Sequence, residues 1–215
     1  MKKTMLLLIA VLMTSVFYSA TGQKRSYMNT KYYKRSLPKF SFGPKAGVNY
    51  ATQSCPNIDD YDVHRIPGIN LGGYFNYFFT HQFAVQPELL YSVKGSRWRD
   101  AYDHMKDVLT YIEIPVLVSY HPVRTFNIHA GPQFGHLISA RQKDLETGEI
   151  SNLRSFYEEY DIGITFGAEA VFPFRLNISL RYFHGLLTVT NDYGYVDPWK
   201  NNYFQVSAGY RFSVR

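Results

Sequence analysis

Tyr203-Phe-Gln-Val-Ser-Ala-Gly-Tyr-Arg-Phe212 decides the fold. In this stretch Phe204 and every second residue after it form an apolar series, and small or polar residues fill most positions between them. Successive side chains of a β-strand point to opposite faces, so the alternation predicts a strand with one apolar and one polar face. Its length is close to the ~9–11 residues with which a tilted strand crosses a membrane.

The same alternation recurs along most of the chain. Eight stretches show it, at residues 40–52, 66–79, 82–95, 108–121, 125–140, 157–172, 174–189 and 202–214. Most are much longer than the ~5–6 residues of an ordinary globular strand. The connections between them are alternately short and long, and the long ones lie near residues 53–65, 96–107, 141–156 and 190–201. An even number of long antiparallel strands predicts a closed up-and-down barrel.

Composition bounds the class of protein. The 215 residues are 46% hydrophobic, 17% aromatic and 19% charged, which excludes a disordered chain. The longest apolar run, Met5 to Met13, is too short for a helix that spans a bilayer. Cys55 is the single cysteine, so neither an internal disulfide nor a cysteine zinc site is expected.

The N-terminus indicates export. Lys2 and Lys3 precede the apolar run, and small residues at Ala20 and Gly22 follow it, a pattern typical of a cleaved signal peptide. The predicted organisation is a signal peptide at 1–22, a basic periplasmic leader at 23–39 and the barrel at 40–215. The leader contains no acidic residue; we interpret it as solvated, with binding to anionic lipid or to a partner as the alternative. An exported chain is not expected to bind nucleic acid.

The alternation alone has two solutions, because a soluble sandwich or lipocalin-like barrel would turn its apolar face inward. The export signal, the strand length, the aromatic excess and the glycine-rich polar faces favour the apolar-out solution. We therefore predict an all-β fold, an eight-stranded antiparallel transmembrane β-barrel with short periplasmic turns and four longer extracellular loops. The expected location is the outer membrane.

The polar faces predict the lumen. An eight-stranded barrel is filled by its own side chains, so an open pore is not expected, and buried charges should pair. The predicted lumen charge network is Lys45, Glu88, Lys94, Glu113, Asp161, Glu169, Arg175, Arg181 and Arg211. The alternative is that Glu88 and Glu113, on consecutive strands, form a carboxylate pair for acid–base chemistry.

One loop offers a candidate binding rim. Arg97, Trp98 and Arg99 would lie where lipopolysaccharide phosphates are found, and an aromatic girdle flanked by solvating charges explains them equally well. Asp59, Asp60 and Asp62 are a candidate cation site, although an acidic solvated loop is the simpler interpretation. The seven histidines form no recognisable catalytic or metal-binding spacing, so we predict no catalytic residues, no metal and no cofactor.

Several strings resemble a known family. They include Gly43-Pro-Lys-Ala-Gly-Val-Asn49, Gln86-Pro-Glu-Leu-Leu-Tyr-Ser-Val-Lys-Gly95, Ala130-Gly-Pro-Gln-Phe-Gly135 and Gly209-Tyr-Arg-Phe212. In this order they resemble the PorT-type outer-membrane β-barrel family of Bacteroidetes. The resemblance implies insertion by the barrel-assembly machinery into outer-membrane lipid and lipopolysaccharide.

Fold does not fix function, so three roles stay open. The first is a non-enzymatic structural or interaction role in the cell envelope. The second is an accessory role in a PorT-type secretion and gliding system, with envelope or secretion complex proteins as partners. The third is a lipid-modifying enzyme.

Overall fold

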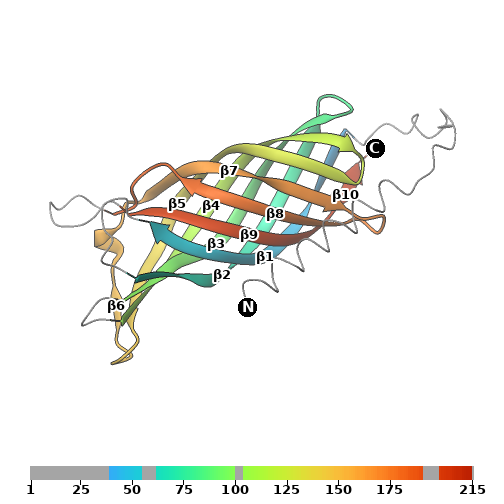
Figure 1. Cartoon of the computed structure of the whole chain (residues 1–215). Helices are drawn as coiled ribbons and strands as arrows, with labels where there is room; N and C mark the ends of the chain where they lie inside the picture. The colour runs from blue at the N-terminus through green and yellow to red at the C-terminus, as the bar shows by residue number, and fades with distance from the viewer. Residues whose placement is uncertain (1–38, 55–61, 100–103, 191–198, 215) are drawn as a thin grey trace. The chain divides into compact units, whose positions relative to one another are not determined.

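A computed structural model describes residues 39–54, 62–99, 104–190 and 199–214, and the predicted signal peptide and nearly all of the predicted leader lie outside them. The described residues form a closed antiparallel β-barrel (Figure 1). Its strands are β1 (Phe40–Ser54), β2 (Asp62–Phe78), β3 (Phe83–Arg99), β4 (His104–Val123), β5 (Phe126–Asp144), β7 (Tyr160–Val171), β8 (Leu176–Gly185) and β9 (Lys200–Tyr210). Each pairs with the next, and β1 pairs with β9 to close the barrel.

Three short elements complete the described part of the chain. β10 (Phe212–Val214) continues the eighth strand beyond a break at Arg211 and pairs with β1. β6 (Ile150–Asn152) pairs with the outer end of β5, and a 3₁₀ turn, η1 (Arg154–Phe156), follows it. No helix among the described residues is long and apolar enough to cross a membrane.

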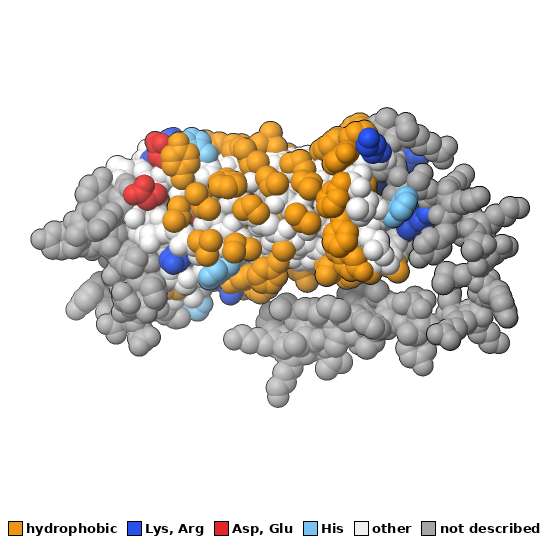
Figure 2. All heavy atoms as spheres, turned by 90° about the horizontal axis from the view of Figure 1, so that it is seen from above, with side chains coloured by type: hydrophobic (Ala, Val, Ile, Leu, Met, Phe, Trp, Pro, Cys, Tyr) orange, Lys and Arg blue, Asp and Glu red, His pale blue; other side chains and the backbone are white. Residues whose placement is uncertain are grey.

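The two faces of the barrel wall confirm the apolar-out solution. Leu71 and Leu89 are each 58% exposed on the outside, whereas Lys45 is 2% and Glu113 0% exposed on the inside. Soluble proteins rarely expose so much contiguous apolar surface. Such a surface is normal on the lipid-facing wall of a transmembrane barrel. Apolar side chains cover the middle of the barrel, and charged side chains gather toward its ends (Figure 2).

The strands differ in length around the barrel. β2 to β5 contain 17–20 residues each, whereas β7 to β9 contain 10–12. The extra length forms a sheet that projects beyond the barrel on the side of the long connections (Figure 1). We call it the extension and define it as residues 96–99, 104–108 and 140–144 together with β6. The predicted long loop at 96–107 is therefore largely made of paired ends of β3 and β4. The sequence did not predict these strand ends because their residues are mostly polar and lack the apolar alternation of the barrel wall.

The opposite end carries the tight turns. In the β7–β8 turn the Arg175 amide donates to the Phe172 carbonyl, and the Phe172 amide donates to the Leu176 carbonyl. Arg175 is exposed and has φ 69°, in the left-handed region. Its assignment to the lumen network is therefore wrong: it occupies a turn position rather than an inward strand position.

Candidate functional site

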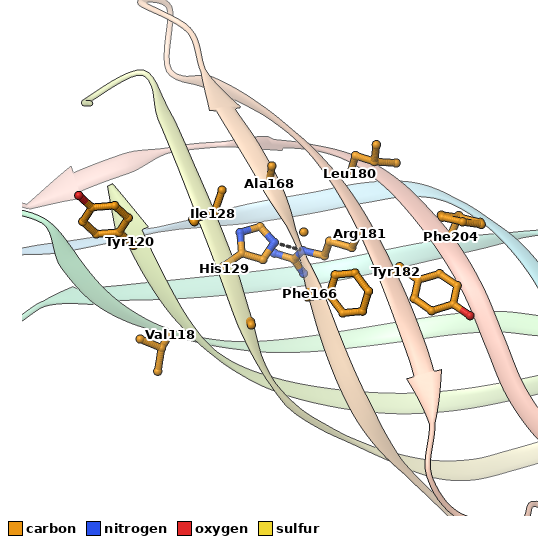
Figure 3. Close-up of a pocket in the computed structure, with 12 residues that line it drawn as sticks. Val118, Tyr120, Ile128, His129, Phe166, Ala168, Leu180, Arg181, Tyr182 and Phe204 are labelled. Carbon is orange, nitrogen blue, oxygen red and sulfur yellow. Dashed lines mark hydrogen bonds between the residues drawn. The ribbon is translucent and has the colours of Figure 1, made fainter. Parts of the chain in front are cut away.

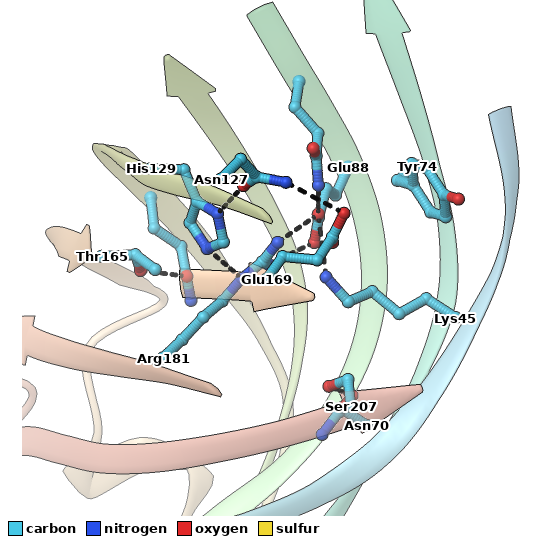
Figure 4. Close-up of polar contacts among 12 residues, drawn as sticks. Lys45, Asn70, Tyr74, Glu88, Asn127, His129, Thr165, Glu169, Arg181 and Ser207 are labelled. Atoms are coloured by element: carbon cyan, nitrogen blue, oxygen red, sulfur yellow. Dashed lines mark hydrogen bonds and ion pairs between the residues drawn. The ribbon is translucent and has the colours of Figure 1, made fainter. Parts of the chain in front are cut away.

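The half of the lumen nearer the tight turns, called the inner half here, holds one carboxylate between two cations. Glu88 accepts a bidentate ion pair from Arg181, with N–O distances of 2.6 and 2.7 Å, and a bond from Lys45 Nζ at 3.2 Å (Figure 4). Gln86 Nε2 donates to the same carboxylate at 2.5 Å. These side chains are at most 3% exposed, so the pairing offsets the cost of burying each charge. We call this set the Glu88 cluster.

Histidine extends the Glu88 cluster. Arg181 Nε donates to His129 Nε2 at 2.9 Å, which requires that nitrogen to be unprotonated, and His129 Nδ1 lies 3.0 Å from Asn127 Oδ1. Asn127 donates in turn to Glu169 at 3.3 Å, and Arg211 pairs with the same Glu169 oxygen at 3.1 Å. Polar contacts therefore run from the middle of the barrel toward the end that carries the tight turns.

The outer half of the lumen has the opposite arrangement, one cation between two carboxylates. Lys94 Nζ lies 2.8 Å from Glu113 and 2.8 Å from Asp161. Tyr203 donates to Glu113 at 3.0 Å, and Asn201 donates to Asp161 at 2.9 Å. We call these five residues the Lys94 cluster.

Aromatic rings surround the ammonium group of Lys94. Its nitrogen lies 4.1 Å from the ring centre of Tyr111, 5.0 Å from Phe183 and 5.1 Å from Tyr203. Ring faces attract cations, so the cage adds to the ion pairs. A Cβ at Gly163 would lie 2.3 Å from the His184 carbonyl oxygen and 2.5 Å from the Phe183 ring, so glycine allows this close approach.

Apolar side chains cover the Lys94 cluster on its outer side. Leu109, Tyr111, Leu137, Ala140, Tyr157 and Val189 form a buried group, and Leu153 and Trp199 pack against it. We call this group the cap. Side chains therefore fill the lumen from the Glu88 cluster to the cap, as expected for eight strands.

A buried acid lies beside the cap, and its hydrogen-bond partners among the described residues are all uncharged. Asp107, in the extension, accepts hydrogen bonds from Trp98 Nε1 at 3.0 Å, Gln142 Nε2 at 2.9 Å and the Tyr157 hydroxyl at 3.2 Å. Burial raises the pKa of the Asp107 carboxyl above its usual range, and the three donors oppose that rise. Burial likewise raises the pKa of Tyr157 well above its usual value.

The structure separates the residues of the predicted rim. Arg97 and Arg99 are exposed on the outer face of β3, whereas Trp98 turns to the other face and donates to Asp107. Trp98 therefore does not share the outward face of Arg97 and Arg99, because strand alternation continues through these positions. The sequence analysis also did not identify Lys106, which lies opposite Arg97 in the strand register, or Lys143, which lies opposite Lys106.

The carboxylate-pair hypothesis finds no support in the geometry. Glu88 and Glu113 belong to different clusters, and each is already engaged by a cation. Within the described ranges no group of three or more potential metal ligands is found. Asp59 and Asp60 of the candidate cation site lie outside those ranges, as does the Asp62 side chain.

Comparison with known proteins agrees with this architecture. The sequence matches the outer membrane protein beta-barrel domain family over residues 18–191. The chain belongs to this family. No curated protein matches the sequence.

Solved outer-membrane barrels are similar in fold. Neisserial surface protein A has 12% identity and a TM-score of 0.50, covering 80% of this chain and 97% of that one. Ail of Yersinia pestis has 14% identity and a TM-score of 0.47, covering 81% and 99%. OprG of Pseudomonas aeruginosa has 11% identity and a TM-score of 0.41, covering 83% and 98%. At 12% identity the likeness to neisserial surface protein A concerns the fold alone.

The outer wall of this outer membrane β-barrel also carries a groove of about 620 Å³ (Figure 3). Small residues, Ala130, Gly167 and Ala168, lie among its lining, and larger ones such as Phe166 and Phe204 flank them. Its lining is almost entirely apolar and belongs to the lipid-facing surface, which suits acyl chains rather than catalysis.

The predicted lumen charge network left out the uncharged residues that complete the two clusters. His129, Gln86 and Tyr203 complete the two clusters, but they do not stand out in a search for charges. Each belongs to the inward-facing series of its own strand, as Glu88 and Arg181 do, and this strand alternation is the sequence signal by which they can be found.

Proposed function

We propose that this outer-membrane β-barrel is a non-enzymatic component of the cell envelope, with a structural or interaction role. The observation that carries the proposal is the filled lumen. Arg181, Lys94 and Glu113 are at most 2% exposed, so a continuous water column past them is not expected. In the part of the chain that the structure describes, the lipid-facing wall and the extension are accessible, and both suit binding rather than turnover. The partners we propose are outer-membrane lipid, lipopolysaccharide and envelope proteins, with insertion by the barrel-assembly machinery.

Reconstitution of the full mature protein tests this role. In planar bilayers we expect no stable ion-conducting steps, and with phospholipid, lipid A or peptide substrates we expect no product by mass spectrometry. Steady conductance would overturn the filled-lumen argument. Product formation that a His64→Ala or His184→Ala variant abolishes would favour the lipid-modifying alternative instead.

A second candidate is an accessory role in a PorT-type secretion and gliding system. The ordered strings that resemble the PorT-type family favour it. Deletion of the gene would then leave cargo proteins in the periplasm, and restoring the intact chain would release them. Normal secretion in the deletion strain would exclude this role and leave the envelope role in place.

A further inference from the structure

The strand register aligns cations across the extension. Arg97 of β3 lies directly opposite Lys106 of β4, and Lys106 lies directly opposite Lys143 of β5. His64 of β2 is the register partner of Arg97 on the other side. Residues that are directly opposite have Cβ atoms ~4.5–5.5 Å apart, so the three cations span roughly 10 Å at their bases. We call Arg97, Lys106 and Lys143 the basic row.

Further cations flank the basic row. Arg99 and Arg141 lie two residues from Arg97 and Lys143 along the same strands, so they share its face, and both are exposed. The ion pairs of the described extension and its adjoining turns involve other residues, His104 with Glu146 and Arg154 with Glu159. Like charges directly opposite on a sheet repel, so this arrangement favours an external anion.

The row lies on the same face as the apolar wall. On β4 the outward residues Val108, Ile112 and Ile114 follow Lys106, and on β3 the outward residue Val93 precedes Arg97 by four residues. With ~3.3 Å per residue and a tilt of ~35–45°, Arg97 lies on the order of 10 Å beyond Val93 along the membrane normal. This is the depth of the headgroup layer rather than of bulk solvent.

We propose that the basic row, flanked by Arg99 and Arg141, binds the phosphate groups of an anionic lipid headgroup in the outer leaflet. The proposal deepens the interaction role and rests on the proposed function. Arginine forms paired hydrogen bonds with phosphate oxygens, and lysine adds point charge. Three strands of one sheet hold the row, which presents its charges as a preformed surface above the membrane.

The test measures lipid binding by the full mature protein in neutral detergent. The probes are bisphosphorylated lipid A, the same lipid without its phosphates, and soluble inositol hexakisphosphate. We expect salt-sensitive binding of the first probe only. Each basic residue near a membrane surface contributes about five-fold, so Gln at all three positions should weaken binding on the order of a hundred-fold.

Controls keep the outcomes distinct. Arg175→Gly removes a cation at the opposite end and should leave lipid A binding unchanged. Heat-modifiable gel mobility shows whether each variant folds, and the single variants Lys106→Gln and Lys143→Gln serve if the triple variant does not.

Three results would overturn the proposal: equal binding of the phosphate-free lipid, unchanged affinity in the folded variants, or equally tight binding of the soluble polyanion. Conductance or enzymatic turnover would instead contradict the proposed envelope role, whatever the lipid results.

Discussion

The two lumen clusters are mirror images in charge. The Glu88 cluster holds one carboxylate between two cations, whereas the Lys94 cluster holds one cation between two carboxylates. With the Arg211–Glu169 pair, the described lumen contains four cations and four carboxylates, so the clusters compensate each other. The comparison teaches that each cluster depends on its single central group, because losing a peripheral charge leaves a one-to-one pair.

The largest effect is expected for Lys94→Met. The substitution leaves Glu113 and Asp161 buried without a cation. Removing one partner of a buried ion pair lowers the free energy of unfolding by about 3–5 kcal/mol. We expect little or no heat-modifiable folded band after refolding into lipid vesicles. The matched control is Lys45→Met, which leaves Glu88 with its bidentate bond to Arg181 and should fold. Equal yields of folded protein for the two variants would contradict the idea that the central charge of a cluster matters more than a peripheral one.

Glu88→Gln makes the reciprocal test. It strands Lys45 and Arg181, and we expect a loss of about 3 kcal/mol in the free energy of unfolding. The matched control, Glu113→Gln, leaves Lys94 paired with Asp161 and should cost about 1 kcal/mol or less. Urea titration in vesicles measures both. The comparison is contradicted if the Glu113 variant is the less stable of the two.

The alternation predicts which residues face inward, but not which of them meet. Lys94 and Asp161 are 67 residues apart, and their contact depends on barrel diameter and register, which no local pattern encodes. The same limit hid the basic row, since Lys106 and Lys143 approach Arg97 only through strand pairing. Arg175 is predicted within a strand that in the structure begins only at Leu176. Trp98 is predicted in a loop after residue 95, whereas β3 continues to Arg99.

Leu137→Ala probes the cap over the Lys94 cluster. Leu137 is 0% exposed in the cap, and truncation of a buried leucine to alanine costs about 2–5 kcal/mol in the free energy of unfolding. Both tryptophans lie at this end, since Trp199 packs on the cap and Trp98 bonds to Asp107. Tryptophan fluorescence therefore reports the loss. Leu117→Ala, below the cap, is the control: it should destabilise the barrel without a change in native tryptophan emission.

Asp107 provides the smallest effect and a third arrangement, a buried carboxylate whose hydrogen-bond donors are all uncharged. Its pKa is raised in the folded state, so the folded extension binds the proton more tightly than the unfolded chain does. The stability that protonation contributes is fully present below the unfolded value of about 3.9 and is lost as pH rises through the raised folded value.

Protease cleavage of the extension in intact vesicles measures this dependence. We expect slower cleavage at pH 4, close to the unfolded value, than at pH 8, while the barrel stays folded. Trp98 and Gln142 do not titrate, and the raised pKa of Tyr157 keeps its hydroxyl neutral across that range. Asp107→Asn removes the titrating group and should abolish the difference. A difference that persists in this variant would show that Asp107 is not the group responsible for the pH effect.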